Sequence, residues 1–277
     1  RPPSTGRVNL HATEAGIFVV DRSIVDAINR VDPAITLATL EPYAAVEAGQ
    51  MGATVKIIPF AVQEGLLARA EAIAGEGSAF SVRPFVPRSI GLIQTVLPSI
   101  KASVLDKTAR ITEARLARSV SRVTGELRPV HEVEAVAEAI RKQARSNDVV
   151  LVFGASAVSD ENDVVPAAIR KAGGEVTRVG MPVDPGNLLV MGSLDGKPVM
   201  GVPGCARSPK LNGFDWVLDR LIAGIEVSPD DIGAMGVGGL LMEIPTRPQP
   251  REERATRAPA KVWAILLAAG QSRRMGP

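Results

Sequence analysis

The first 87 residues show a mixed pattern of apolar and polar positions. Two stretches of alternating β-branched residues, 6–12 and 15–21, predict a pair of strands joined by a turn. Asp21 is a suitable N-cap for a helix over 22–31, where apolar residues recur at helical spacing. Together these elements predict a small α+β domain over 1–87, for which we expect docking or scaffolding rather than chemistry. Its remaining predicted elements are strands at 35–40 and 52–60 and a helix at 64–75.

A regular alternation of strands and helices begins after Arg83-Pro84 and Val86-Pro87, which mark a predicted domain boundary. Uninterrupted apolar runs indicate strands buried on both faces, so we expect a mostly parallel sheet in a three-layer α/β domain over 88–244. Asp195-Gly196 lies between two strand-like runs and predicts a hairpin. The predicted order is a strand at 89–97, a helix at 103–120, a weaker strand at 124–129, a helix at 133–146, a strand at 148–154, a helix at 163–173, a strand at 175–183, the hairpin at 187–203 and a closing helix at 208–224.

The pattern changes again near the C-terminus. Residues 245–261 are rich in Pro and Arg and have no apolar period, so they predict a linker. Val262 to Leu267 are apolar and predict a buried strand, which leads into small and cationic residues. Such a strand and loop are suited to hold a nucleoside triphosphate. We therefore expect 262–277 to be the truncated start of a further domain.

Composition narrows the classes of protein to which the chain could belong. A formal net charge of +2 is too balanced to favour nucleic acid or an anionic membrane as a partner. No apolar stretch is long enough to predict a membrane span. Cys205 is the single cysteine, which is typical of a reducing cytoplasm and provides neither a disulfide nor a zinc cluster. His11 and His131 have no second ligand nearby in sequence, so no metal site is predicted.

Three loops of the predicted sheet could bind a ligand, because ligands of open α/β sheets lie at the carboxyl ends of the strands. Their small residues would let the backbone approach an anion, and Arg207 and Lys210 would attract negative charge. Asp163 could instead cap the next helix, Cys205 could be a buried filler, and the two cations could form a solvated rim. The candidates are Asp106, Lys107 and Thr108 in the first loop, Gly154, Ser156 and Asp163 in the second, and Pro203, Gly204, Cys205, Arg207, Ser208 and Lys210 in the third.

At these loops, over about residues 89–224, the sequence resembles the molybdopterin-binding domain of Mog-type and MoeA-type molybdenum cofactor proteins. The resemblance implies a Mog-like fold and a site for molybdopterin or its metal-loaded form. Ala155 and Ala157 depart from family glycines, and His131 stands where the family has a carboxylate, so binding is better supported than catalysis. The matching stretches are Asp106-Lys107-Thr108, Gly154-Ala155-Ser156-Ala157 with Asp163-Val164-Val165-Pro166, Pro185-Gly186-Asn187, Gly196-Lys197-Pro198 and Val202-Pro203-Gly204-Cys205-Ala206.

The stretch from Leu267 to Gly276 resembles the N-terminal signature of MobA-type and MocA-type nucleotidyltransferases. In a complete protein the resemblance implies a loop that holds the triphosphate of CTP or GTP, with Mg²⁺ as a further requirement. The implied nucleotide-binding residues are Leu267, Ala268, Ala269, Gly270, Ser272, Arg273 and Arg274.

The two resemblances imply a cytoplasmic, bacterial protein of molybdenum cofactor biosynthesis. Its central domain would bind molybdopterin, and the full-length protein would be a cytidylyl- or guanylyltransferase, although this chain would be inactive in that step. The alternatives are a non-catalytic module that binds or delivers the pterin, and an interaction domain with an empty site. The expected partners are the pterin phosphate, further copies of the chain, and molybdoenzymes or their chaperones, with neither nucleic acid nor membrane. No catalytic residue is assigned.

Overall fold

The computed structural model describes residues 6–75 and 77–242, and residues up to Met242 belong to one compact unit. The predicted linker at 245–261 and the predicted nucleotide-binding residues between Leu267 and Arg274 lie outside the described residues.

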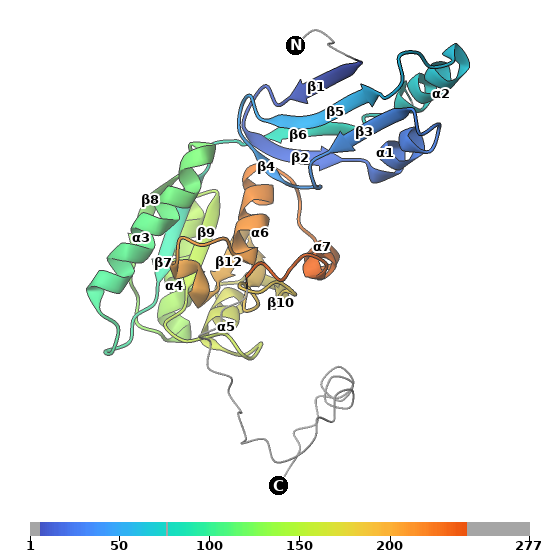
Figure 1. Ribbon diagram of the computed structural model, residues 1–277. Helices are drawn as coiled ribbons and strands as arrows, with labels where there is room; N and C mark the ends of the chain where they lie inside the picture. The colour runs from blue at the N-terminus through green and yellow to red at the C-terminus, as the bar shows by residue number, and fades with distance from the viewer. Residues whose placement is uncertain (1–5, 76, 243–277) are drawn as a thin grey trace, which may run out of the picture. The chain divides into compact units, whose positions relative to one another are not determined.

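The N-terminal region contains two three-stranded antiparallel sheets (Figure 1). One has the order β1-β5-β3, and the other has the order β4-β2-β6. Helices α1 (Arg22–Asn29) and α2 (Glu64–Gly75) accompany them and lie where the apolar pattern predicts. The strands are β1 (Arg7–His11), β2 (Gly16–Val20), β3 (Ile35–Thr39), β4 (Ala45–Val46), β5 (Met51–Ile57) and β6 (Phe80–Pro84).

The expected pairing of β1 with β2 is wrong, although both segments are strands. β1 pairs with β5, whereas β2 pairs with β4 and β6. Phe18 of β2 is buried and its ring stacks on that of Phe80 in β6, with the ring centroids 5.5 Å apart. Alternation along a strand indicates which side chains face a core, but the partner strand is chosen by packing between distant segments.

Helix α1 begins as its sequence predicts. The Asp21 carboxylate accepts hydrogen bonds from the backbone N–H groups of Ser23 and Ile24. These bonds satisfy N–H groups that have no partner within the helix. Val25 and Ile28 of this helix are buried and pack against residues of the β1-β5-β3 sheet.

The central region is built on a six-stranded sheet with the order β10-β11-β12-β9-β7-β8. The four neighbours β12, β9, β7 and β8 are parallel, and β10 and β11 add an antiparallel edge. The predicted mostly parallel α/β fold is therefore confirmed. The strands are β7 (Ser89–Gln94), β8 (Arg122–Leu127), β9 (Val149–Phe153), β10 (Glu175–Val179), β11 (Val190–Leu194) and β12 (Lys197–Val202).

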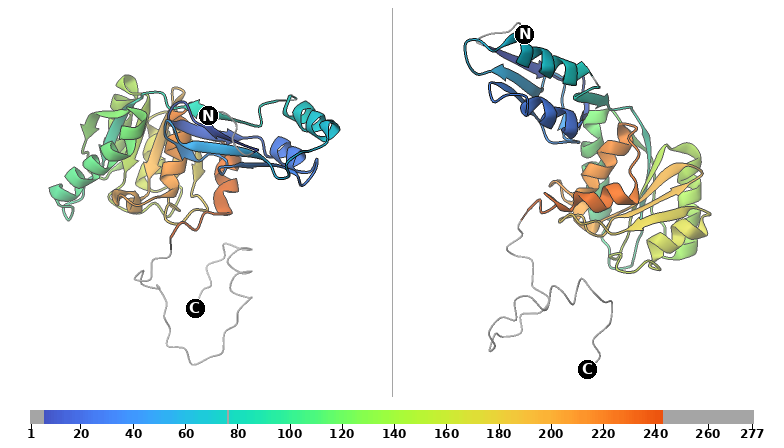
Figure 2. Two further views of the ribbon diagram at one scale, coloured as in Figure 1. Left: turned by 45° about the horizontal axis from the view of Figure 1, so that its top comes forward. Right: turned by 90° about the vertical axis from the view of Figure 1, so that its right-hand side faces the viewer.

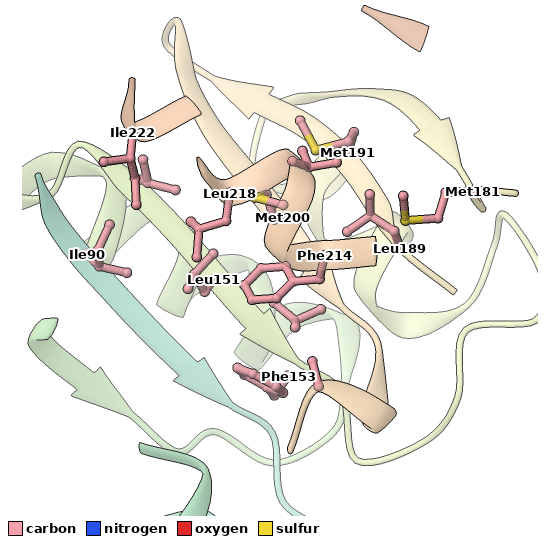
Figure 3. Close-up of a cluster of buried hydrophobic side chains, with 14 of the residues drawn as sticks. Ile90, Leu151, Phe153, Met181, Leu189, Met191, Met200, Phe214, Leu218 and Ile222 are labelled. Atoms are coloured by element: carbon pink, nitrogen blue, oxygen red, sulfur yellow. The ribbon is translucent and has the colours of Figure 1, made fainter. Parts of the chain in front are cut away.

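Helices cover both faces of this sheet (Figures 1 and 2). Alternate residues of the central strand β9 separate the two cores: Leu151 and Phe153 face one core, and Val150 and Val152 face the other. Figure 3 shows the first core, where Phe214 and Leu218 of α6 pack over β9. The helices are α4 (Val133–Ser146) and α5 (Val164–Lys171) on one face, and α3 (Ala102–Leu116), α6 (Gly213–Ile222) and α7 (Pro229–Gly233) on the other.

The hairpin between β11 and β12 turns at Asp195-Gly196, as predicted. Both residues have positive φ angles, 51° and 74°, which match the right-handed twist of the flanking strands.

Other predicted bounds differ from the structure. β7 ends at Gln94, and α3 ends at Leu116 before a short 3-10 turn. Pro84 is the last residue of edge strand β6 and does not lie in a connection between elements. An edge strand tolerates proline because one side of its backbone needs no partner strand. The domain boundary after Pro87 stays a prediction.

Asp219 of α6 should make stability depend on pH. Its carboxylate is buried and bonds to Arg118, and burial raises its pKa to about 6 despite that cation. Between pH 3.8 and about 6 the folded protein keeps a proton that the unfolded chain has lost, so stability falls as pH rises through this range. The difference is worth up to about 3 kcal/mol.

We expect Asp219→Asn to remove this fall, measured by urea unfolding across the pH range. Asp195→Asn, at the exposed hairpin turn, is the control and should unfold in parallel with the wild type. The prediction would be contradicted if the free energy of unfolding of Asp219→Asn had the same dependence on pH as that of the wild type.

Candidate functional site

The carboxyl ends of β7, β9 and β12 lie side by side, because these three strands are parallel neighbours in the sheet. The loops that follow β9 and β12 enclose a shallow pocket. Its polar rim is made by Ser156 and backbone groups, and its walls are small or apolar. The lining residues include Gly154, Ser156, Ala157, Val158, Leu188, Pro203 and Gly204.

The loop after β9 begins with a glycine that the packing requires. A Cβ atom on Gly154 would lie 2.9 Å from the Ser156 carbonyl oxygen and 3.4 Å from Val165 Cγ2. The next residue, Ala155, donates its backbone N–H to Thr95 Oγ1 over 2.7 Å. The loop is therefore held close to the end of β7. In the described part of the chain, the backbone N–H groups of Ser156 and Ala157 have no acceptor, and both residues are exposed.

A row of three side chains crosses the base of this loop. Thr95 Oγ1 lies 2.8 Å from His131 Nδ1, and His131 Nε2 lies 2.8 Å from Ser156 Oγ. His131 is held just beyond β8, where its backbone N–H donates to the Val96 carbonyl. Burial lowers the pKa of His131, and the nearby Asp163 carboxylate offsets only part of this effect. The imidazole is therefore neutral at neutral pH.

Asp163 stands at the N-cap position of α5 but does not cap it through its side chain. Its Oδ2 atom accepts the backbone N–H groups of Ser159 and Asp160, over 2.7 and 2.9 Å. These bonds lower the pKa of Asp163 and fix the loop that leads into α5. The carboxylate shapes the loop and is not among the groups that line the pocket.

Arg207, in the short 3-10 helix after β12 (Gly204–Arg207), is half-buried and has only uncharged partners. Nη1 donates to Gln94 Oε1 at 3.1 Å and to Thr108 Oγ1 at 2.8 Å, and Nη2 donates to the Gly154 carbonyl at 3.2 Å. The guanidinium also lies over the ring of Phe153, 5.0 Å from its centroid. Burial lowers the pKa of Arg207, and no carboxylate of the described chain forms an ion pair with it.

Gln94 links Arg207 to a separate group of charged side chains. Its Nε2 atom donates to Glu126 Oε1 and to the Leu105 carbonyl, which leaves Oε1 to accept from Arg207. Arg128 in turn donates to Glu126 and to Asp106. The carboxylates nearest to the site on this side are thus already paired with Arg128.

A second arginine, Arg115, holds the loop after β12 through hydrogen bonds to its carbonyl groups. Arg115 of α3 donates to the carbonyl groups of Ala206, Ser208 and Lys210 and forms a buried ion pair with Asp215, with 2.6 Å between Nε and Oδ1. Asp215 also accepts the backbone N–H of Asn212 in the capping box of α6. The loop, α3 and α6 are therefore joined at one point.

The structure brings together some of the predicted residues and separates others. Gly154, Ser156, Pro203 and Gly204 line the pocket, and Thr108 and Arg207 are hydrogen-bonded to each other behind it. The rest contribute differently. Asp106 and Lys107 are exposed on α3, the Ser208 carbonyl accepts from Arg115, Cys205 is exposed and accepts from Asn212, and Lys210 is exposed with its Nζ 3.7 Å from Met242 Sδ.

Sequence reasoning missed the groups that hold the site from behind, namely Gln94, Thr95 and Arg115. Gln94 and Thr95 are polar residues at the end of an otherwise apolar run, and both are fully buried. A buried polar pair at the carboxyl end of a strand is a signal that could have indicated them. His131 has no second metal ligand nearby in sequence, which argues only against a metal site, and its partners in the structure are hydroxyl groups.

The described residues, 6–75 and 77–242, contain neither a metal-binding cluster nor a membrane-spanning helix. Within these ranges no group of three or more His, Cys, Asp or Glu side chains is arranged to hold a metal ion. None of the helices in the same ranges has the length and apolar character needed to cross a membrane.

The contact at Gly154 predicts a difference between two glycines of the pocket. Gly154→Ala should force the Ser156 carbonyl to move and cost roughly 1–3 kcal/mol in the free energy of unfolding. Gly204→Ala is the matched control, because a Cβ there meets nothing within 4 Å, and it should change stability by less than about 0.5 kcal/mol. Equal urea midpoints for the two variants would refute the steric argument.

Arg115→Met should be strongly destabilising, by about 3–5 kcal/mol, because it leaves the buried Asp215 carboxylate without its cation. Arg110→Met, an exposed position of the same helix, should cost less than about 0.5 kcal/mol. Thermal or urea unfolding of both variants checks the difference. A loss of less than about 1 kcal/mol for Arg115→Met would show that the ion pair is dispensable.

Comparison with known proteins gives one family match, within the central region. Residues 99–223, slightly less than half of the chain, match the family model described as "Probable molybdopterin binding domain". This matched segment contains α3, β8, β9 and the loops of the pocket. No curated protein matches the chain.

Several solved structures are similar to the chain at low identity. A molybdopterin biosynthesis moea protein from Pyrococcus horikosii is 16% identical with a TM-score of 0.37, and the match covers 79% of this chain and 72% of that one. A molybdenum cofactor biosynthesis protein B is 15% identical with a TM-score of 0.35, covering 52% and 92%. A molybdenum cofactor biosynthesis protein from Pyrococcus furiosus is 17% identical with a TM-score of 0.33, covering 78% and 68%.

Proposed function

We propose that the central domain binds a phosphorylated pterin of the molybdopterin type at the carboxyl ends of β7, β9 and β12. The family match of residues 99–223 supports the ligand class, and the pocket at these strand ends supports the location. The apolar side chains of Val158 and Leu188 would contact the pterin ring, and the Ser156 loop and Arg207 would receive its phosphate.

Arg207 is the observation that carries this proposal. A half-buried guanidinium whose partners are all uncharged loses hydration without gaining a counter-ion, which is unfavourable for a folded protein. A bound anion would supply the missing charge.

The guanidinium keeps donors free for this role. Three of its five N–H groups are used by Gln94, Thr108 and Gly154, which leaves Nε–H and one Nη2–H. Arg220 Nε is the one buried side-chain nitrogen or oxygen without a partner in the described ranges. The unpartnered Nε of Arg207 is therefore accessible to a ligand.

The loop after β9 would hold the anion by hydrogen bonds from neutral groups. The exposed backbone N–H groups of Ser156 and Ala157 and the Ser156 hydroxyl lie on one short turn at the pocket rim. Successive N–H groups on a turn can form a concave site for a phosphate. Gly154 is required for this turn to pass close to Val165.

The arrangement favours binding over catalysis. Asp163 is committed to two backbone N–H groups, and Asp106 and Glu126 are paired with Arg128. Among the described residues, these three carboxylates are therefore already bonded, whereas Arg207 and the N–H groups of the loop are donors without an anionic partner. We infer a module that holds or delivers the pterin. An interaction domain with an empty site is the alternative that the experiment below excludes or supports.

The motif at Leu267–Gly276 supports one further step for the whole protein, a CTP- or GTP-dependent nucleotidyl transfer to the bound pterin phosphate. This step is inferred from the motif alone. We expect the present chain to carry out no such transfer, since the motif comprises only the ten residues 267–276. Incorporation of labelled nucleotide into molybdopterin by this chain would contradict that expectation.

Arg207→Gln should weaken molybdopterin binding, because it removes a charge-assisted hydrogen bond worth about 1.5–3 kcal/mol, or roughly 10- to 150-fold in affinity. Lys210→Gln removes the same charge three residues away but on an exposed side chain, and it should change affinity little. Molybdopterin retention after anaerobic purification, with titration at two salt concentrations, measures both effects. Thermal unfolding of each variant controls for loss of the fold. Equal retention by wild type and Arg207→Gln would contradict the role of Arg207, and no retention by the wild type would favour the empty site.

A further inference from the structure

Thr95 is fully buried, and its side-chain hydroxyl has two hydrogen-bond partners in the described part of the chain. One partner is the backbone N–H of Ala155, which can only donate, so Thr95 Oγ1 accepts there. The other partner is His131 Nδ1, 2.8 Å away. The Thr95 hydroxyl therefore either donates a hydrogen bond to Nδ1 or accepts one from it.

The burial of Thr95 decides between them. If His131 Nδ1 carried a proton, Thr95 Oγ1 would accept from two donors and its own proton would have no acceptor. An unsatisfied polar hydrogen in a buried position is costly and rare. The Thr95 hydroxyl therefore donates to Nδ1, which must be unprotonated.

The remaining proton of the imidazole follows from this assignment. A neutral histidine with a bare Nδ1 carries its proton on Nε2. Nε2 lies 2.8 Å from Ser156 Oγ, so His131 donates to the serine. The Ser156 hydroxyl then has its own hydrogen available, and the residue is exposed at the pocket rim.

We propose that His131 is a positioning residue that, as the Nε2–H tautomer held by Thr95, directs the Ser156 hydroxyl hydrogen outward to an anionic oxygen of the ligand. The proposal deepens the proposed function, on which its ligand part depends. The row Thr95, His131, Ser156 gives the pocket a donor of fixed orientation. The pocket would then favour a ligand group that only accepts, such as a phosphate oxygen, over one that donates.

The charges around His131 are consistent with a neutral ring. Asp163 is the charged group that acts on the imidazole and favours its protonation, but burial has the larger effect and lowers the pKa. Protonation would place hydrogens on both ring nitrogens and remove the acceptor of the Thr95 proton. The hydrogen bonds and the pKa shift therefore act in the same direction.

The wild-type protein tests the assignment directly. Long-range proton–nitrogen NMR spectra of uniformly labelled protein at about pH 7 distinguish the two neutral tautomers and the imidazolium. His11, which lies on β1 far from the pocket in sequence, is the other histidine of the chain and serves as an internal reference. We expect the Nε2–H tautomer for His131. An Nδ1–H tautomer or an imidazolium there would overturn the proposal.

Two threonine variants provide a matched pair. Thr95→Ser keeps the hydroxyl and should keep both the tautomer and the affinity for inorganic phosphate, followed through the amide shifts of Ser156 and Ala157. Thr95→Val has nearly the same shape but no hydroxyl, so the tautomer should become mixed. Its phosphate affinity should fall toward that of Ser156→Ala, for which we expect a loss of roughly tenfold or more. A Thr95→Val protein that is folded, with an unchanged tautomer and unchanged affinity, would also overturn the proposal.

The failure of this inference and the failure of the proposed function give different results. Retention of molybdopterin by a protein whose His131 carries its proton on Nδ1 would overturn the role of His131 and leave the proposed function intact. An Nε2–H tautomer in a protein that binds neither phosphate nor molybdopterin would overturn the proposed function and the ligand part of the inference together.

Discussion

The guanidinium of Arg207 joins the elements that form the pocket. It bonds to Gln94 at the end of β7, to Thr108 on α3 and to the Gly154 carbonyl at the end of β9, and it stacks on Phe153. All of these partners are uncharged. The same contacts that position the loops therefore leave a positive charge without a counter-ion at the strand ends. Under the proposed function, structural order and affinity for an anion come from one side chain, because the groups that orient it do not neutralise it.

The parallel sheet makes this convergence possible. Four neighbouring parallel strands end at the same edge, so residues that are far apart in sequence, such as Thr95 and Ala155, can bond directly. The two cores on either side hold the strands rigidly, with Leu151 and Phe153 packed on one face and Val150 and Val152 on the other. Below the pocket, Arg115 and Asp215 fix the loop after β12 to α3 and α6. Rigid surroundings keep an oriented donor such as Ser156 in place without help from the ligand.

The site differs from a typical metal-dependent phosphate site in the groups that it offers. Asp163 shapes the loop before α5, and Glu126 and Asp106 neutralise Arg128, so the carboxylates serve the fold. Ser156 lines the pocket, His131 bonds to its hydroxyl, and Arg207 donates to the Gly154 carbonyl behind it. Such a set of donors suits the recognition of a negative group more than the transfer of a proton or a phosphoryl group. This is the physical basis for proposing a pterin-binding module.

The sequence by itself determined the order and type of most elements, because burial on one or both faces leaves a period in the apolar residues that does not depend on distant contacts. The N-cap at Asp21, the turn at Asp195-Gly196 and the unbroken run of β9 are of this kind. It also indicated Gly154, Ser156 and Arg207, since small residues after a strand let the backbone approach an anion and a cation attracts it. Only the tertiary structure decided that β1 pairs with β5, that Asp163 bonds to its own loop, and that Arg207 lacks a counter-ion. These outcomes depend on which groups from distant parts of the sequence come into contact. Such a contact leaves no periodic pattern of residues along the chain from which it could be predicted.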